Sequence, residues 1–185
     1  GSVIRYPLEP LPNETYAASG TRGGPFSPPS KTYTLTNTGG ASLSWSLTHT
    51  QSWVSVLPGS GTLPGGASLT VTGSINSAAS LLASGQYGDT LVFSNSASGA
   101  VRRRAVALSV VTPGLSIADA TVLEGDAGTT NILFTVSLLP RTLQTVTVAY
   151  ATSNGTAQAG SDYFATNGLL TFTAGQTNAT VMVAV

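Results

Sequence analysis

Hydrophobic and polar residues alternate along most of this chain, and the alternation predicts β-strands. A period of two is typical of strands that bury one face of an antiparallel sheet. Turn sequences rich in Gly and Pro separate the alternating segments every 8–12 residues or so, as in an all-β sandwich. Nowhere does an apolar stripe recur at helical spacing over three turns. The side chains expected on core faces in the first half are Tyr33, Leu35, Leu43, Trp45, Leu47, Leu69, Val71, Val106, Leu108 and Val110.

The alternation is interrupted near the N-terminus and restarts after a short boundary. Residues 3–30 are rich in Pro and Gly, which predicts an extended arm with one short strand over residues 14–18. The sequence Thr112-Pro113-Gly114 is the one credible linker. After it, strands are expected in residues 115–125, 131–139, 144–152, 168–173 and 178–185.

These patterns predict an all-β fold of two tandem immunoglobulin-like β-sandwiches, the second incomplete. We expect residues 1–30 to form an N-terminal arm plus the first strand of domain 1, and residues 31–111 to form an immunoglobulin-like sandwich. Residues 112–114 are the linker, and residues 115–185 are the second sandwich. Five strands in about 70 residues fall short of the roughly seven strands in about 100 residues that a sandwich normally has. Open edges would result, so we expect an edge-strand homodimer or a borrowed segment.

The amino-acid composition excludes some classes of binding partner but does not identify one. Only 8% of the residues are charged, and seven basic residues balance seven acidic ones. A chain without net charge has no electrostatic case for binding nucleic acid. There are no cysteines, and no apolar run reaches the roughly 20 residues of a membrane span. A Thr-, Ser- and Gly-rich β chain of this kind is typical of exported bacterial proteins, so we expect a piece of a larger extracellular or cell-surface protein.

Specific motifs in the second half resemble the Calx-beta family. They are Glu124-Gly125-Asp126, the segment TVTVAYATSNGTAQAGSDY at 145–163, and GLLTFTAGQTNATVMVAV at 168–185. The resemblance covers residues 114–185 and implies a sandwich that binds Ca²⁺ at one end. It also implies that Glu124 and Asp162 match two ligand positions, with Asp126 as a helper, and that further ligands come from an acidic segment after the last strand present. Residues 52–66, SWVSVLPGSGTLPGG, are similar to BACON-type immunoglobulin-like modules.

Two interpretations of Asp162 are open. Calcium takes about 6–8 oxygen ligands, and a bare Gly/Ser/Ala loop lets backbone carbonyls approach an ion. Two or three carboxylates alone predict an affinity on the order of millimolar. Alternatively, Glu124 and Asp162 are turn residues, because Asp readily caps its own backbone.

Other candidate residues point to binding rather than to catalysis. Trp53 is the speculative carbohydrate-binding residue, since a flat aromatic face suits a sugar ring. The single histidine, His49, is expected at a strand end, and no nucleophile motif accompanies it. We interpret Arg102-Arg103-Arg104 as charged protection of an edge strand, with phosphate or polysaccharide binding as the alternative.

The function expected is that of a non-catalytic structural or adhesion module that contacts another protein or a cell-surface glycan, not an enzyme. The alternative is a glycan-binding accessory module of a secreted enzyme. A glycan array with Trp53→Ala as control would separate the two.

Overall fold

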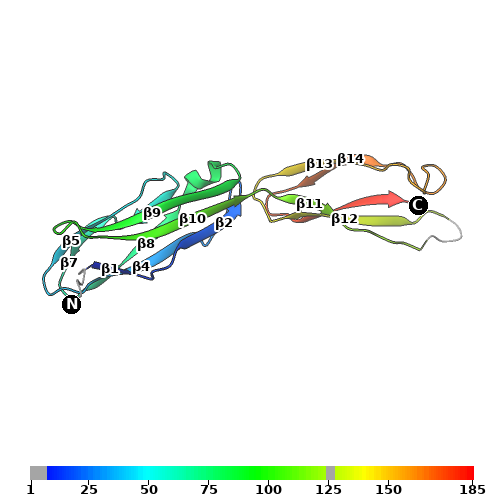
Figure 1. Cartoon of the computed structure of the whole chain (residues 1–185). Helices are drawn as coiled ribbons and strands as arrows, with labels where there is room; N and C mark the ends of the chain where they lie inside the picture. The colour runs from blue at the N-terminus through cyan, green and yellow to red at the C-terminus, as the bar shows by residue number, and fades with distance from the viewer. Residues whose placement is uncertain (1–7, 124–127) are drawn as a thin grey trace. The chain divides into compact units, whose positions relative to one another are not determined.

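The chain divides into two compact units, Gly1–Val111 and Thr112–Val185. The computed structural model describes residues 8–123 and 128–185 (Figure 1). The described residues form strands and one short 3₁₀ helix, η1 (Ser77–Leu81), with no α-helix among them, so the all-β prediction is confirmed. No helix in the described ranges is long and apolar enough to cross a membrane.

The first unit is a sandwich of two sheets. One sheet has the order β1-β4-β8-β6, with β1 (Leu8–Leu11), β4 (Ser30–Asn37), β8 (Ser68–Ile75) and β6 (Val54–Leu57). The other sheet has the order β3-β2-β10-β9-β5-β7. Its strands are β3 (Phe26–Ser27), β2 (Tyr16–Thr21), β10 (Val101–Val111), β9 (Gly85–Asn95), β5 (Leu43–Thr48) and β7 (Ser60–Leu63).

The core of this unit lies where the two sheets face each other. The residues that alternation assigned to core faces are buried there, with Leu69 partly buried against the cluster. The rings of Tyr33 and Phe93 meet edge to face, with centroids 5.6 Å apart. The prediction of core faces in this half is therefore confirmed.

The N-terminal region is more ordered than its Pro and Gly content predicts. Residues 8–27 contribute three strands, where only one was expected. β1 pairs antiparallel with β4, and β2 pairs in parallel with β10, so that Tyr16 lies opposite Val106. β1 contains Pro10 and lies at a sheet edge, where a missing N–H need not interrupt a ladder, which is why proline is tolerated there.

The second unit also has two layers, and they are unequal (Figure 1). A three-stranded sheet has the order β11-β12-β15, with β11 (Gly114–Ile117), β12 (Asn131–Leu139) and β15 (Asn178–Ala184). A two-stranded sheet pairs β13 (Val146–Ala151) with β14 (Asn167–Phe172). The strand expected over residues 115–125 ends at Ile117, and residues 118–123 have no regular structure.

A smaller core joins these two layers. It is built on five buried residues, Val136, Leu138, Phe172, Val181 and Val183. The inward side chains of β13 are only partly buried against it. Five strands thus bury fewer side chains here than the ten strands of the first unit.

Candidate functional site

The loop that carries Asp162 joins β13 to β14 and is held by its own polar side chains. The Asn154 side-chain oxygen accepts from the Ala159 N–H at 2.8 Å and from the Tyr163 hydroxyl at 2.7 Å. Its amide nitrogen donates to the Gln158 side chain at 2.9 Å, and the Gln158 amide nitrogen donates to the Gly155 carbonyl at 2.8 Å. Gly160 turns the chain with a φ of 93°, a conformation that favours glycine. The loop geometry is therefore specified locally.

Asp162 closes this loop. Its Oδ2 accepts from the Gln158 N–H at 2.7 Å, and its own N–H donates to the Gln158 carbonyl at 2.9 Å. This reciprocal pair is the turn role that one of the two sequence interpretations assigns to the residue. Among the described residues Oδ1 has no hydrogen-bond donor, and the side chain is exposed. One carboxylate oxygen therefore remains available to a ligand.

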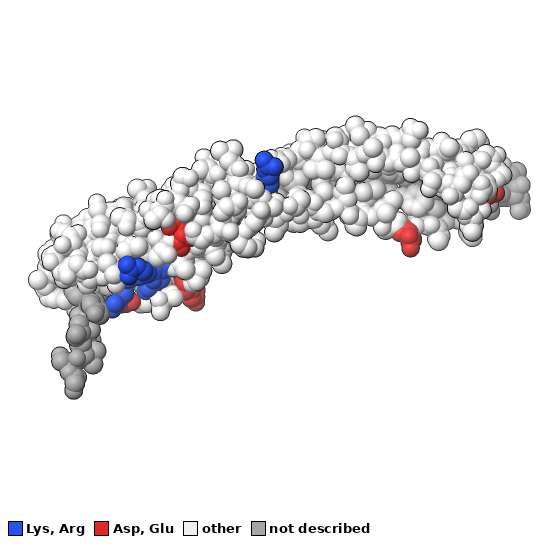
Figure 2. All heavy atoms as spheres, turned by 45° about the horizontal axis from the view of Figure 1, so that its top comes forward, with Lys and Arg blue, Asp and Glu red and all other residues white. Residues whose placement is uncertain are grey.

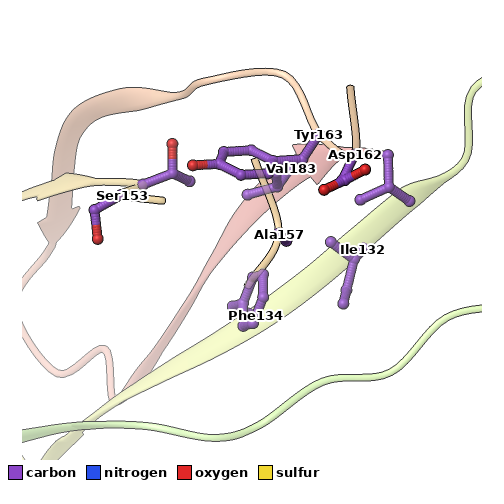
Figure 3. A pocket seen from close by; sticks show the side chains of 9 residues that line it. Ile132, Phe134, Ser153, Ala157, Asp162, Tyr163 and Val183 are labelled. Atoms are coloured by element: carbon purple, nitrogen blue, oxygen red, sulfur yellow. The ribbon is translucent and has the colours of Figure 1, made fainter. Parts of the chain in front are cut away.

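A hollow of about 280 Å³ lies beside Asp162 (Figure 3). Figure 3 shows Phe134 and Ile132 rising from β12, with Tyr163 and Asp162 facing them from the loop. Asp162 is the one charged residue among the described residues that line it; the others are Ile132, Phe134, Thr152, Ser153, Ala157, Tyr163, Val183 and Val185. The carboxylate thus lies at the margin of an apolar surface.

The described residues alone do not make a complete cation site. No group of three or more His, Cys, Asp or Glu residues that could hold a metal ion occurs within residues 8–123 and 128–185. Asp162 offers one carboxylate, whereas calcium takes about 6–8 oxygens. Glu124 and Asp126, the other two predicted ligands, lie outside the described residues. Whether the three carboxylates share one site stays a prediction.

Trp53 is not available to a sugar. The residue is 2% exposed and belongs to the core of the first unit, although it lies just before β6. A ring must present a free face to stack on a sugar, so the carbohydrate-binding role predicted for Trp53 finds no support in its position. The alternation in the short segment SWVSVL did not show whether the Trp53 ring faces the core or the solvent.

The interpretation of the three arginines as edge protection is wrong. β10 lies inside its sheet, between β2 and β9. Arg104 is 5% exposed and donates to the carbonyls of Pro10, Pro12 and Arg103. Glu9 reaches Arg104 Nη2 at 3.4 Å and Arg102 Nε at 3.1 Å. Arg102 and Arg104 thus hold the N-terminal strand β1 in place, and Figure 2 shows basic and acidic side chains together on this unit.

A buried carboxylate that sequence reasoning missed lies at the end of the first sandwich. Asp89, whose side chain is 1% exposed, accepts from the N–H groups of Thr50, Gln51 and Thr90. Burial by itself raises the pKa of Asp89, but these hydrogen bonds outweigh it and hold that pKa below its ordinary value. His49 Nδ1 lies 3.7 Å from Asp89 Oδ2 and 3.1 Å from the Gln51 carbonyl oxygen. The pair closes the loop after β5, as expected of a strand-end histidine.

Comparison with known proteins agrees with this architecture. Residues 109–185 match the sequence model of the Calx-beta domain, and residues 27–104 match that of the viral BACON domain. No curated protein matches the chain significantly.

Solved structures resemble the chain at low sequence identity. CBD12 from CALX1.2 is 12% identical with a TM-score of 0.48, over 91% of this chain and 71% of that one. The human CEP192 PapD-like domain 7 is 14% identical with a TM-score of 0.45, over 60% of this chain and 92% of that one. A Porphyromonas gingivalis W83 protein of unknown function is 15% identical with a TM-score of 0.42, over 97% and 83%. By these two sequence matches, the first unit is similar to a BACON domain and the second unit is similar to a Calx-beta domain.

Proposed function

We propose that this chain is a non-catalytic structural or adhesion module of a larger extracellular protein, and that its Calx-beta domain binds calcium weakly at the Asp162 loop. The observation that carries the proposal is the exposed Asp162 carboxylate. Gln158 and Asn154 hold its loop in place, and one of its oxygens has no donor among the described residues. The Calx-beta match supports the choice of ion.

The role of calcium in this proposal is mechanical. An ion that binds the folded loop and not the unfolded chain stabilises the folded state, which stiffens the end of the domain that carries the loop. The module then presents a surface to another protein or to a cell-surface glycan. Because residues 27–104 match a viral domain family, the proposal places the parent protein either on a bacterial surface or on a virus particle.

A calcium titration of thermal stability tests the proposal. With a dissociation constant on the order of 1 mM, roughly 10 mM calcium stabilises the Calx-beta domain by about 1.4 kcal/mol. For a domain of 60–100 residues this raises Tm by about 6–11 °C. Asp162→Asn should abolish the shift, because the amide carries no charge.

Two controls make the result specific. Asp119→Asn removes an exposed acid of the same unit and should leave the calcium shift intact. Both tryptophans lie in the first unit, so tryptophan fluorescence should report no calcium effect while circular dichroism does. Equal unfolding curves in excess calcium and in chelator would remove the calcium proposal.

A further inference from the structure

The second unit contains two Asn-Gly dipeptides, and the structure places them in contrasting surroundings. Asn154-Gly155 lies in the loop between β13 and β14, and Asn167-Gly168 begins β14. Both residues of the first pair are exposed. In an Asn-Gly pair the backbone nitrogen of the glycine can attack the side-chain amide of the asparagine, because glycine has no Cβ to hinder a close approach. The same dipeptide thus occurs at two places, and the fold decides which of them can react.

The two glycines differ in how far the fold covers them. A Cβ added at Gly155 would meet nothing within 4 Å, whereas one at Gly168 would lie 2.7 Å from the Tyr150 hydroxyl oxygen. Tyr150 lies opposite Gly168 in the β13–β14 ladder. Thr152 N donates to Thr166 O just beyond the strands, so the alternation of the ladder makes Tyr150 and Gly168 a hydrogen-bonded pair. The Gly168 nitrogen is therefore both covered and held in the sheet.

The side-chain carbonyl of Asn154 is polarised by two donors. Its Oδ1 accepts from the Ala159 N–H at 2.8 Å and from the Tyr163 hydroxyl at 2.7 Å. Donors in these positions stabilise the negative charge that develops on the oxygen when a nucleophile adds to the carbonyl carbon. The Gly155 N–H donates to the Ala157 carbonyl at 3.1 Å, and this bond must open before the nitrogen attacks. The loop thus activates the carbonyl and restrains the nitrogen by a single exposed hydrogen bond.

We propose that Asn154 is a self-modifying site, where the Gly155 nitrogen drives conversion of the asparagine to aspartate and isoaspartate. Hydroxide takes the proton of the Gly155 N–H, and the nitrogen adds to Asn154 Cγ, which closes a succinimide ring. The bond between Cγ and Nδ2 breaks, and the amide nitrogen takes a proton from water and leaves as ammonia. Water then opens the ring at either of its two carbonyls, which gives an aspartyl or an isoaspartyl residue. No atom is oxidised or reduced, so water and hydroxide are the only co-reactants.

The reaction changes the loop that carries Asp162. Asn154 Nδ2 donates to the Gln158 side-chain oxygen at 2.9 Å, and Asp162 Oδ2 accepts from the Gln158 N–H at 2.7 Å. A carboxylate at position 154 cannot donate, so the first of these bonds is lost and the loop is anchored less firmly. A second negative charge also appears in a loop that holds one. The reaction needs no metal ion, so this inference does not rest on calcium binding.

Peptide mapping by mass spectrometry measures the reaction at both asparagines in one sample. The whole chain is incubated in mildly alkaline buffer that contains a chelator, and chromatography separates the aspartyl and isoaspartyl peptides. Conversion should be at least about tenfold faster at Asn154 than at Asn167, because the Gly168 N–H becomes reactive only when the ladder opens. It should slow in mildly acidic buffer, where hydroxide is scarce.

Three variants test the roles of the two reacting groups. Gly155→Ala fits the fold, because its Cβ meets nothing, and it should slow conversion of Asn154 by at least about tenfold. Tyr163→Phe removes one donor to Oδ1 and should slow it by about 2–10-fold. The matched control Tyr150→Phe removes a hydroxyl of the same unit that does not contact Asn154 and should leave that rate unchanged.

Circular dichroism should show that all three variants fold. Three results would overturn the proposal: no conversion of Asn154, equal rates at Asn154 and Asn167, or a Gly155→Ala variant that reacts as fast as the unmodified chain. Faster conversion in Tyr163→Phe would contradict the activating role of the two donors.

Discussion

Removal of the Asp89 carboxylate should destabilise the first unit far more than removal of an ordinary surface acid. Asp89 lies on the inner face of β9, in register with Leu91 and Phe93. It accepts from three backbone N–H groups and from the Thr50 hydroxyl at 2.8 Å. These donors lose their shared acceptor once the side chain is gone. The whole loop after β5 is therefore expected to lose its fixed position in Asp89→Ala.

The size of the effect follows from the number of donors. A hydrogen bond to a charged group contributes about 1.5–3 kcal/mol, so four such bonds set an upper limit of roughly 6–12 kcal/mol. Water reaches the loop in the variant and satisfies part of the loss. We expect Asp89→Ala to lower the free energy of unfolding by about 3–5 kcal/mol, the usual cost of breaking a buried charged network. Asp89→Asn keeps one acceptor oxygen and should lose about half as much.

Urea unfolding followed by tryptophan fluorescence measures this selectively, because Trp45 and Trp53 both lie in the first unit. The pH dependence supplies a second test. A carboxyl with a lowered pKa stabilises the fold above about pH 3.9, its ordinary value, and that stability is lost as the pH falls through the folded-state pKa. The difference between the unmodified chain and Asp89→Asn should therefore shrink in acid. A loss below about 0.5 kcal/mol at neutral pH, the range of ordinary surface substitutions, would refute the reasoning.

Two further predictions concern how the N-terminal strands are held. Arg104→Ala should lower the free energy of unfolding by about 3–5 kcal/mol in the same assay, because it leaves the carbonyls of Pro10 and Pro12 without their buried donor. Arg103 is exposed, so the control Arg103→Ala should change that free energy by less than about 0.5 kcal/mol. Gly20→Ala should cost about 1–3 kcal/mol, since its Cβ would lie 2.2 Å from a backbone carbonyl oxygen. Gly40→Ala meets nothing within 4 Å and is the matched control; equal losses in the two glycine variants would contradict the steric argument.

Alternation predicts this fold because each strand buries one face. Tyr33, Leu35, Trp45 and Leu108 were assigned to the core by their period alone, and the structure buries all four. The period does not identify which strands become neighbours. The parallel pairing of β2 with β10 joins segments about 90 residues apart, and no local pattern encodes it.

Two of the three N-terminal strands, β1 and β3, were missed for a different reason. Proline removes the N–H donors that define a strand, so residues 3–30 were predicted to form an extended arm with one short strand over residues 14–18. The carbonyl groups of these residues still need hydrogen-bond donors, and the Arg104 guanidinium donates to the carbonyls of Pro10 and Pro12. A buried arginine beside a proline-rich edge strand is thus a compensation that propensity alone does not predict.

The candidate loop was predicted in part. Its turn chemistry was visible in the small residues around Asp162, and the reciprocal bonds with Gln158 agree with the turn interpretation. The contribution of Asn154, which accepts from Ala159 and Tyr163, was not anticipated. An asparagine that anchors a loop from its far end leaves no local spacing signature.

The polar residues that sequence reasoning overlooked or misassigned in the first unit share one property. Four such residues are buried: Asn37, Asp89, Asn95 and Arg104. Each lies on the core-facing side of its strand, two residues before or after the last apolar residue on that side. Each also binds backbone groups of an adjacent loop or strand; Asn37, for example, donates to the carbonyls of Ala41 and Leu63. A polar residue on the apolar face is costly unless it is bonded, so its presence in that register marks where a loop is tied to the sandwich. In other β-sandwich sequences, a polar residue that continues the alternation on the core-facing side of a strand should likewise identify a side chain that anchors a loop.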